Sequence, residues 1–305
     1  MLENILFFAL SLNKDANLNT IKNNVKDLDF TRNRIVEFMD PSDSYFNTKK
    51  INKDSLDVEN NFKSGMIFDY NTGEIYWKKN IEEKRSIASL TKMMTVLTFL
   101  DLNVDLYKYV KVTSDIAVMD VKDSAAIGFT PGEEILIKDV LYSGYIGSKN
   151  DAINLLVKST DLSYSDFVIK MNEKAKSLDL KNTVFTNVNG LDDGNVSTAE
   201  DLSKLAYYAF SNKVIDKLSQ TEEYTFKSRS GKIYKVKNTN KLLGNGSFTI
   251  IAGKTGYLDS ALYCLTLFTS KDQKKLISIL LGNDTEIGRF SDAEALNSWV
   301  YRTWK

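Results

Sequence analysis

The sequence predicts an α+β fold in which one antiparallel sheet is flanked by helices and holds an inserted, mostly helical subdomain. Three observations support this fold class. A strand hairpin begins near residue 64, the middle third has helical apolar spacing, and the last third contains hairpin-linked strands followed by a helix. Strands from both ends of a chain can share one sheet when helices are inserted between them. The first hairpin and the last strands are therefore expected to form a single sheet.

The composition is that of a globular protein and excludes several classes of function. The chain has 305 residues, 43% hydrophobic and 11% aromatic, enough for two compact lobes or one large domain. Lys+Arg and Asp+Glu are both 40, so the zero net charge argues against broad nucleic-acid binding. Without histidine, and with Cys264 as the one cysteine, disulfide frameworks and common zinc sites are excluded. We predict no metal and no cofactor, and a buried thiol at Cys264.

The first part of the chain is weakly patterned. Residues 1–60 are rich in Asn, Asp and Lys and predict a helical or loop extension, with a folded domain over residues 61–305. The apolar run Ile5–Leu10 is much shorter than the roughly 20 residues of a membrane span, so no clear membrane span is predicted. It follows Glu3 rather than basic residues, which makes a poor signal peptide. A truncated targeting segment and an ordinary buried helix turn both remain open.

The first clear elements are a hairpin and a buried helix. Gly65–Tyr70 and Glu74–Trp77 have strand composition on either side of the turn signal Asn71-Thr72-Gly73. The segment Ser89–Leu100 then has apolar residues nearly all round a helix, so it is expected to be buried on most sides. Burial would strip water from any charged side chain on that helix.

The middle third is expected to be helical, and the last third to be mostly strand. After a turn at Thr130–Glu134, apolar spacing predicts four helices: Ile135–Tyr145, Asn150–Ser159, Ser163–Leu178 and Thr198–Phe210. Strands are expected in five segments, the first two joined through the turn Arg229-Ser230-Gly231: Tyr224–Phe226, Ile233–Val236, Ile250–Ala252, Ala261–Phe268 and Leu276–Leu281. An amphipathic helix over Phe290–Trp304 closes the chain.

Ser89-Leu90-Thr91-Lys92 contains a candidate nucleophile and its base. Histidine is the most frequent base for a serine nucleophile, and this chain has none. A lysine three residues after a serine lies one helical turn away on the same face, and lysine can act as the base when its neutral form is favoured. A second copy, Ser11–Lys14, shows that the spacing alone is weak. Ser89 differs from it because it opens a buried helix, whose dipole favours a developing oxyanion.

Two further short segments become informative through their order. Ser148-Lys149-Asn150 lies between two helical segments, where Ser and Asn are also common N-cap residues. Lys254-Thr255-Gly256 lies in a strand region, although Lys63-Ser64-Gly65 is a similar match and a turn with a solvated lysine would give the same letters. Ser-x-x-Lys, then Ser-x-Asn, then Lys-Thr-Gly is the three-part signature of penicillin-binding proteins and serine β-lactamases.

From about residue 64 the chain resembles the low-molecular-weight serine D-alanyl-D-alanine carboxypeptidases, peptidase family S11. The resemblance extends beyond the three short segments, through these stretches in order: Arg85–Thr95, Leu180–Thr183, Gly190–Asp192, Ser197–Leu202, Asn238–Leu243 and Gly253–Tyr257. It implies a β-lactamase/transpeptidase-like fold and an extracytoplasmic protein of the bacterial cell envelope or a secreted one. The partners it implies are peptidoglycan stem peptides ending in D-Ala-D-Ala and β-lactams that bind covalently.

The resemblance also implies a role for each site residue. Ser89 would attack the D-Ala-D-Ala carbonyl carbon and Lys92 would take the serine proton. Ser148 would relay a proton to the leaving amine, and Asn150 would hold the substrate amide. The remaining residues would bind substrate: Lys254 and Thr255 the terminal carboxylate, Gly256 the passing backbone, and Tyr257 the oxyanion, through its N–H together with that of Ser89.

Alternatives remain at this point. A DD-endopeptidase would carry the same motifs. A class A β-lactamase would add a Glu-x-x-Leu-Asn segment, and none lies between Ser148 and Lys254. A catalytically silent envelope protein could keep the fold as a binding or scaffold module. Lys149 departs from the small residue that many relatives have there, and no β-rich domain is expected after the closing helix.

Overall fold

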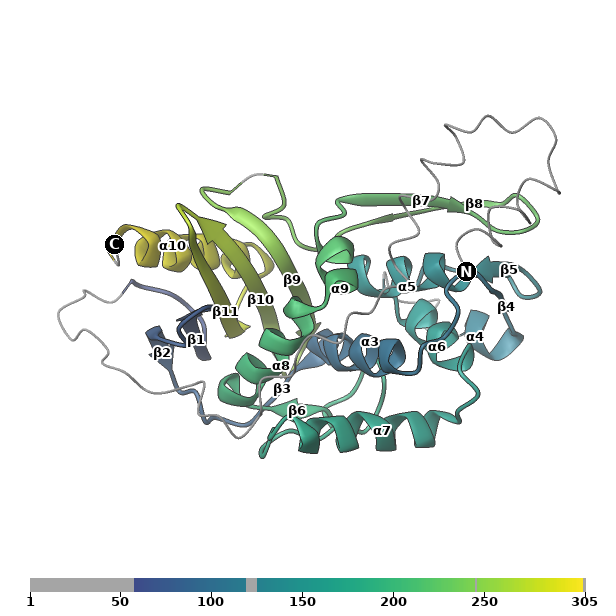
Figure 1. The fold of residues 1–305 in the computed structure, drawn as a ribbon, viewed down its shortest axis with the longest axis horizontal. Helices are drawn as coiled ribbons and strands as arrows, with labels where there is room; N and C mark the ends of the chain where they lie inside the picture. Colours follow the sequence, from purple (N-terminus) through teal and green to yellow (C-terminus); the bar gives the residue numbers. More distant parts are fainter. Residues whose placement is uncertain (1–57, 119–124, 245, 304–305) are drawn as a thin grey trace, which may run out of the picture. The chain divides into compact units, whose positions relative to one another are not determined.

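The structure, a computed structural model, describes residues 58–118, 125–244 and 246–303, all of which belong to one compact unit. The predicted extension therefore lies, up to residue 57, outside the described residues, as does the second Ser-x-x-Lys copy. The main sheet is antiparallel throughout and has the strand order β2–β1–β11–β10–β9 (Figure 1). Its strands are β1 (Ser64–Asp69), β2 (Ile75–Lys79), β9 (Thr249–Leu258), β10 (Leu262–Lys271) and β11 (Lys274–Asn283). The predicted sharing of one sheet by both ends of the chain is confirmed.

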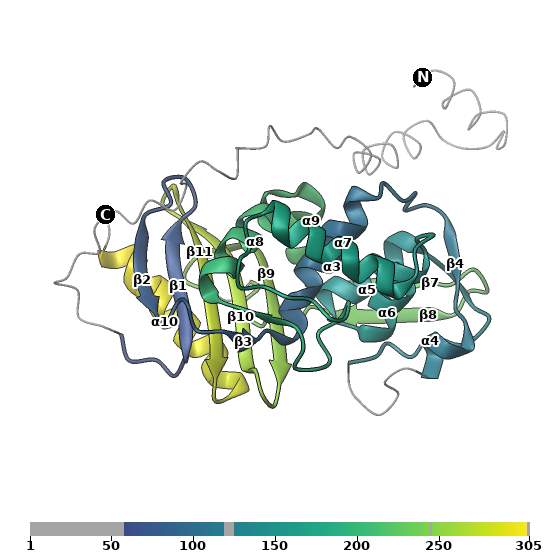
Figure 2. The same cartoon turned by 90° about the horizontal axis from the view of Figure 1, so that it is seen from below.

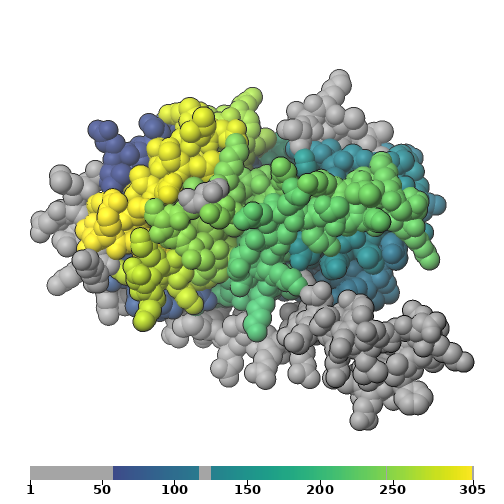
Figure 3. Space-filling view, turned by 90° about the horizontal axis from the view of Figure 1, so that it is seen from above, coloured from purple at the N-terminus to yellow at the C-terminus, as the bar shows by residue number. Residues whose placement is uncertain are grey.

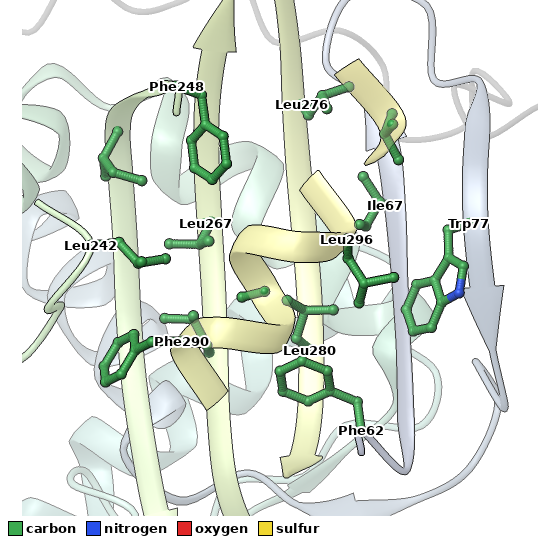
Figure 4. Close-up of a cluster of buried hydrophobic side chains, with 14 of the residues drawn as sticks. Phe62, Ile67, Trp77, Leu242, Phe248, Leu267, Leu276, Leu280, Phe290 and Leu296 are labelled. Carbon is green, nitrogen blue, oxygen red and sulfur yellow. The ribbon is translucent and has the colours of Figure 1, made fainter. Parts of the chain in front are cut away.

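Helices cover both faces of this sheet. The C-terminal helix α10 (Glu286–Thr303) lies on one face and α8 (Ala199–Ser211) on the other, as Figures 1 and 2 show. Alternating side chains of β11 explain this, because Leu276, Ser278 and Leu280 face α10 while Ile277 and Ile279 face the other way. That core also contains Leu267 and Leu296 (Figure 4).

The middle of the chain forms the predicted helical subdomain. Its helices are α3 (Thr91–Asp101), α4 (Ser114–Val118), α5 (Ile137–Ile146), α6 (Asn150–Lys158), α7 (Tyr164–Ser177) and α9 (Lys213–Ser219). Nine of the eleven residues of α3 are buried, as its apolar pattern predicted. The side chain of Ser163 caps α7 by accepting a hydrogen bond from the Asp166 N–H. Cys264 is a buried free thiol, as expected, and burial raises its pKa to about 11.

Two sequence predictions need correction. The hairpin of β7 (Glu223–Lys227) and β8 (Ile233–Lys237) does not join the main sheet; it forms its own two-stranded ribbon next to α5. It lies on the face seen in Figure 3, in green. Ile135 was expected in a helix but lies in β5 (Glu134–Leu136), which pairs with β4 (Tyr109–Lys111). Tertiary contacts decide both outcomes: β5 pairs with a strand more than twenty residues earlier, and the β7–β8 hairpin packs on α5. Local apolar spacing encodes neither contact.

A third small ribbon, formed by β3 (Arg85–Ser86) and β6 (Val196–Ser197), joins the segment before Ser89 to the segment before α8. Among the helices of residues 58–118, 125–244 and 246–303, none combines the length and apolar character needed to cross a bilayer. The elements that matter for the site are α3, the start of α6, the β3–β6 ribbon and β9, which is one of the two edge strands of the main sheet.

Candidate active site

The predicted nucleophile and base are in contact. Ser89 lies in a 3-10 turn, η2 (Ala88–Leu90), directly before α3, and the Nζ atom of Lys92 is 2.6 Å from its Oγ atom. Ala88 has a φ of 47°, a left-handed conformation that is unusual for a residue with a Cβ atom. Strain of this kind persists where the surrounding structure enforces it. Here it turns the chain just before Ser89.

Lys92 is completely buried and has three oxygen partners. Besides Ser89 Oγ, its Nζ atom donates to Asn150 Oδ1 at 2.7 Å and to the backbone carbonyl oxygen of Asn189 at 2.9 Å. These three oxygen atoms hold the Lys92 amine in one position. The arrangement fixes the amine against the serine oxygen, as a base for that hydroxyl requires.

A second pair of predicted residues meets beside the first. Lys254 Nζ donates to Ser148 Oγ at 2.9 Å and to the Thr255 carbonyl oxygen at 2.9 Å. Ser148 also has a left-handed backbone, with φ of 54°, and precedes α6, whose first residue is Asn150. The turn before α6 therefore presents Ser148 to one lysine and Asn150 to the other.

Positive charge is concentrated around Lys254. Burial lowers its pKa well below the ordinary value for lysine, and the charges of Lys92 and Arg289 lower it further. Arg289 comes from α10, is 5% exposed, and donates from Nη1 to the carbonyl oxygen of Gly256 at 3.1 Å. Three cationic side chains thus converge on one end of β9. Such a cluster favours a ligand that carries a carboxylate.

The edge strand β9 presents the third motif to the nucleophile. Thr255 is buried and its hydroxyl is 2.6 Å from that of Thr239. A Cβ atom on Gly256 would lie 3.2 Å from the backbone nitrogen of Ser89, so glycine permits the close approach of β9 to the nucleophile turn. Tyr257, the next residue, is 47% exposed and its ring stacks on Tyr263 at 4.3 Å.

The structure brings together all eight residues predicted from the sequence. Five are connected by the hydrogen bonds of Lys92 and Lys254, and three follow one another along β9 beside Ser89. Sequence reasoning missed Arg289, Thr239 and the carbonyl of Asn189. Thr239 lies in a stretch that resembles the family, so that signal was present. Arg289 and a backbone carbonyl had no sequence signal.

The described part of the chain holds no group of three or more His, Cys, Asp or Glu side chains placed to bind a metal ion. The groups that meet at this site are a serine hydroxyl, two lysine amines, a second serine and an asparagine amide.

Comparison with known proteins relates the chain to a group of peptidases. Residues 49–285 match the model of the peptidase S11 family, described as D-alanyl-D-alanine carboxypeptidase. The D-alanyl-D-alanine carboxypeptidase DacF of Bacillus subtilis is 32% identical over 243 residues, which cover 78% of this chain and 61% of that protein. The D-alanyl-D-alanine endopeptidase of Escherichia coli is also 32% identical, over 78% of this chain and 76% of that protein. The chain thus spans about three fifths of the length of its Bacillus relative.

Solved structures agree with the fold. The crystal structure of the Streptomyces K15 DD-transpeptidase superposes with a TM-score of 0.76 at 28% identity, and the match covers 81% of this chain and all of that one. The expected β-lactamase/transpeptidase-like α+β fold is confirmed, with the five-stranded antiparallel sheet at its centre.

Proposed function

The chain belongs to the D-alanyl-D-alanine carboxypeptidase family, peptidase S11, and from this premise we propose that it is a serine carboxypeptidase removing the terminal D-Ala of peptidoglycan stem peptides. It would act outside the cytoplasm, where that polymer lies, and would bind β-lactams covalently. One observation carries the proposal. Lys92 Nζ lies 2.6 Å from Ser89 Oγ, and the lysine is completely buried.

Acylation is the first step. Ser89 Oγ attacks the carbonyl carbon of the penultimate D-Ala while its proton passes to neutral Lys92 Nζ. The negative charge that develops on the carbonyl oxygen is stabilised by backbone N–H groups of Ser89 and Tyr257. The C–N bond then breaks, and the leaving amine of terminal D-Ala takes up a proton through Ser148. The products are an ester on Ser89 and free D-Ala.

Deacylation and substrate binding use the same groups. A water molecule attacks the ester carbon, loses a proton, and releases the shortened peptide as Ser89 regains its hydrogen. Before acylation, Lys254 and Thr255 bind the terminal carboxylate, and Arg289 adds positive charge beside them. The substrate lies along the open edge of β9 as an additional strand, and Asn150 holds its amide.

A DD-endopeptidase is the second candidate, because the Escherichia coli relative of that name is as similar to this chain as the Bacillus carboxypeptidase. Both activities would cut a bond that follows D-Ala and use the same serine chemistry. They differ in what lies beyond the leaving amine, a free amino acid or a crosslinked stem peptide. A direct comparison of the two substrates decides between them.

The experiment combines a labelled penicillin with two peptides. The protein is incubated with the penicillin, with a stem peptide ending in D-Ala-D-Ala, and with a crosslinked stem-peptide dimer. We expect one covalent adduct per chain and release of D-Ala from the linear peptide, with slower cleavage of the dimer. Lys92→Met should slow acylation by about 10²–10⁴-fold, the contribution of a general base.

The chain provides a matched control, because Ser11 occupies the same Ser-x-x-Lys spacing as Ser89. Ser89→Ala should abolish both adduct and D-Ala release, whereas Ser11→Ala should leave both unchanged. An adduct that persists in Ser89→Ala would exclude Ser89 as the nucleophile. Rapid turnover of the penicillin would identify a β-lactamase. A folded wild-type protein that forms no adduct and cuts neither peptide would be a binding or scaffold protein.

A further inference from the structure

The third partner of Lys92 comes from a segment outside any helix or strand. The carbonyl oxygen of Asn189 accepts from Lys92 Nζ at 2.9 Å, and residues 185–190 around it form bends and loop. A backbone carbonyl can hold a catalytic amine in place only if its own segment is held in place. The neighbouring contacts show what holds it.

Asn195 is completely buried, and both the oxygen and the nitrogen of its side-chain amide bond to this loop. Its Oδ1 atom accepts hydrogen bonds from the backbone N–H of Thr186 at 2.7 Å and of Asn187 at 3.1 Å. Its Nδ2 atom donates to the carbonyl oxygen of Asn187 at 2.9 Å. The amide therefore fixes the backbone two residues before the carbonyl that Lys92 contacts.

The same residue also contacts the nucleophile segment. Nδ2 of Asn195 donates to Thr91 Oγ1 at 2.9 Å, and its backbone carbonyl accepts from the Ile87 N–H at 3.1 Å. Thr91 precedes Lys92, and Ile87 lies two residues before Ser89. One residue thus connects the segment before Ser89 and the residue before Lys92 to the loop that carries the third acceptor.

The fit of the loop against the nucleophile turn is tight. Gly190 has φ of 76°, and a Cβ atom there would lie 2.0 Å from the carbonyl oxygen of Ala88. Asn187 Oδ1 accepts from the Gly190 N–H at 2.7 Å, which closes the turn behind Asn189. A small shift of this loop would therefore move the Asn189 carbonyl relative to Lys92 and Ser89.

We infer that Asn195 is a positioning residue for the reaction: by fixing residues 186–190 to the nucleophile segment, it sets the location of the amine of Lys92. The inference rests on the proposed function, in which Lys92 is the base. The Asn195 side chain bonds to Thr91 and to the loop, so its effect on Lys92 is transmitted through them. Misplacement of a reacting group by about 1 Å costs about 10²-fold in rate.

The test separates positioning from simple stabilisation. The acylation rate constant and the dissociation constant of the non-covalent complex are measured with labelled penicillin for Asn195→Ala and Thr91→Val. Final adduct stoichiometry gives the folded fraction, so the rate refers to folded protein alone. We expect Asn195→Ala to lower the rate constant by about 10–100-fold and Thr91→Val by less. The dissociation constant should change by less than about threefold in both, because Lys254 and Thr255 keep their contacts.

Asn297 is the matched control. It is also completely buried, with Nδ2 donating to the Ala293 carbonyl oxygen at 2.8 Å and Oδ1 accepting from Ser278 Oγ at 2.8 Å, in the α10 core. Asn297→Ala should lower stability without changing the acylation rate constant of the folded fraction. Full stoichiometry at the wild-type rate in Asn195→Ala overturns the inference, as does an equal loss of rate in Asn297→Ala.

A second readout does not depend on activity. The side-chain ¹⁵N signal of Lys92, assigned by its absence from Lys92→Met, reports the environment of the amine. We expect Asn195→Ala to shift this signal and to speed exchange of its protons with water, and Asn297→Ala to do neither. If the wild type forms no adduct, the proposed function fails, and this signal alone then decides the inference: an unchanged Lys92 signal in Asn195→Ala overturns it.

Discussion

Arg289 Nη1 donates a hydrogen bond to the carbonyl oxygen of Gly256 at 3.1 Å, so the C-terminal helix holds strand β9 at a residue that passes close to the nucleophile. The guanidinium is 5% exposed, and its charge is one of the causes that lower the pKa of Lys254. A helix assigned to the core by its apolar residues therefore also contributes to the electrostatics of the site.

Replacing Arg289 by leucine should slow acylation and raise the pH at which acylation declines on the alkaline side. Lys254 binds a carboxylate only when charged, and its charged fraction falls as the pH rises through its pKa. Without Arg289 that pKa rises, so the alkaline decline should shift to higher pH. The measurement is the pH profile of acylation by a carboxylate penicillin, with Arg302→Leu, an exposed residue of the same helix, as control. An alkaline decline at unchanged or lower pH in Arg289→Leu would contradict the claim that Arg289 lowers the pKa of Lys254.

Lys254→Met should abolish peptide cleavage without loss of stability. The folded pKa of Lys254 is lowered, so between it and the ordinary lysine pKa the unfolded chain binds a proton that the native protein does not. Wild-type stability should therefore rise with pH across that window, and this contribution disappears in Lys254→Met. Below the folded pKa, where Lys254 is charged in the native protein, removal of the buried charge should raise the free energy of unfolding by about 1–3 kcal/mol. Urea denaturation over a pH series checks this.

The control for that experiment is Lys181→Met, since the Lys181 side chain is 74% exposed. It should change the free energy of unfolding by less than about 0.5 kcal/mol. Clear destabilisation of Lys254→Met at every pH would show that the bond from Lys254 to Ser148 outweighs the desolvation of the charge.

Gly190→Ala should damage both stability and acylation. Its φ of 76° requires a left-handed conformation, and its Cβ atom would lie 2.0 Å from the Ala88 carbonyl oxygen. Gly132→Ala is matched in backbone, with φ of 86° and no atom within 4 Å of the added Cβ. Gly132→Ala should therefore lower the free energy of unfolding by about 1–2 kcal/mol, through the left-handed conformation alone. Gly190→Ala should lower the free energy of unfolding by more than that and should also slow acylation. If Gly190→Ala and Gly132→Ala have equal effects in denaturation and acylation assays, the loop does not approach Ala88 closely at Gly190.

Leu296→Ala should destabilise the protein by about 2–5 kcal/mol, because Leu296 is completely buried between α10 and the sheet. Ile287, on the same helix, is 79% exposed, and Ile287→Ala should change the free energy of unfolding by less than about 0.5 kcal/mol. Thermal or urea denaturation of the pair measures the difference. Similar values for both would mean that α10 does not pack on the sheet as described.

The sequence was sufficient where the determining interactions are local. Apolar spacing predicted α3, α6, α7 and α8 to within a few residues, and the Asn71–Gly73 turn predicted the first hairpin. It failed at Ile135 and at the β7–β8 ribbon, where pairing partners decide the structure. It also had no access to β3 and β6, two-residue strands whose pairing joins segments more than a hundred residues apart.

By itself the sequence determined that Ser89 and Lys92 would be neighbours, because they are three residues apart and a single turn brings them together. The order of the three motifs determined the family. Tertiary structure alone decided what completes the site: Lys254 meets Ser148 across 106 positions, and the Asn189 carbonyl reaches Lys92 across 97. Arg289 arrives from a helix on the far side of the sheet. A backbone carbonyl has no residue signature, and a long-range partner is chosen by packing, so neither could be found before the chain was folded.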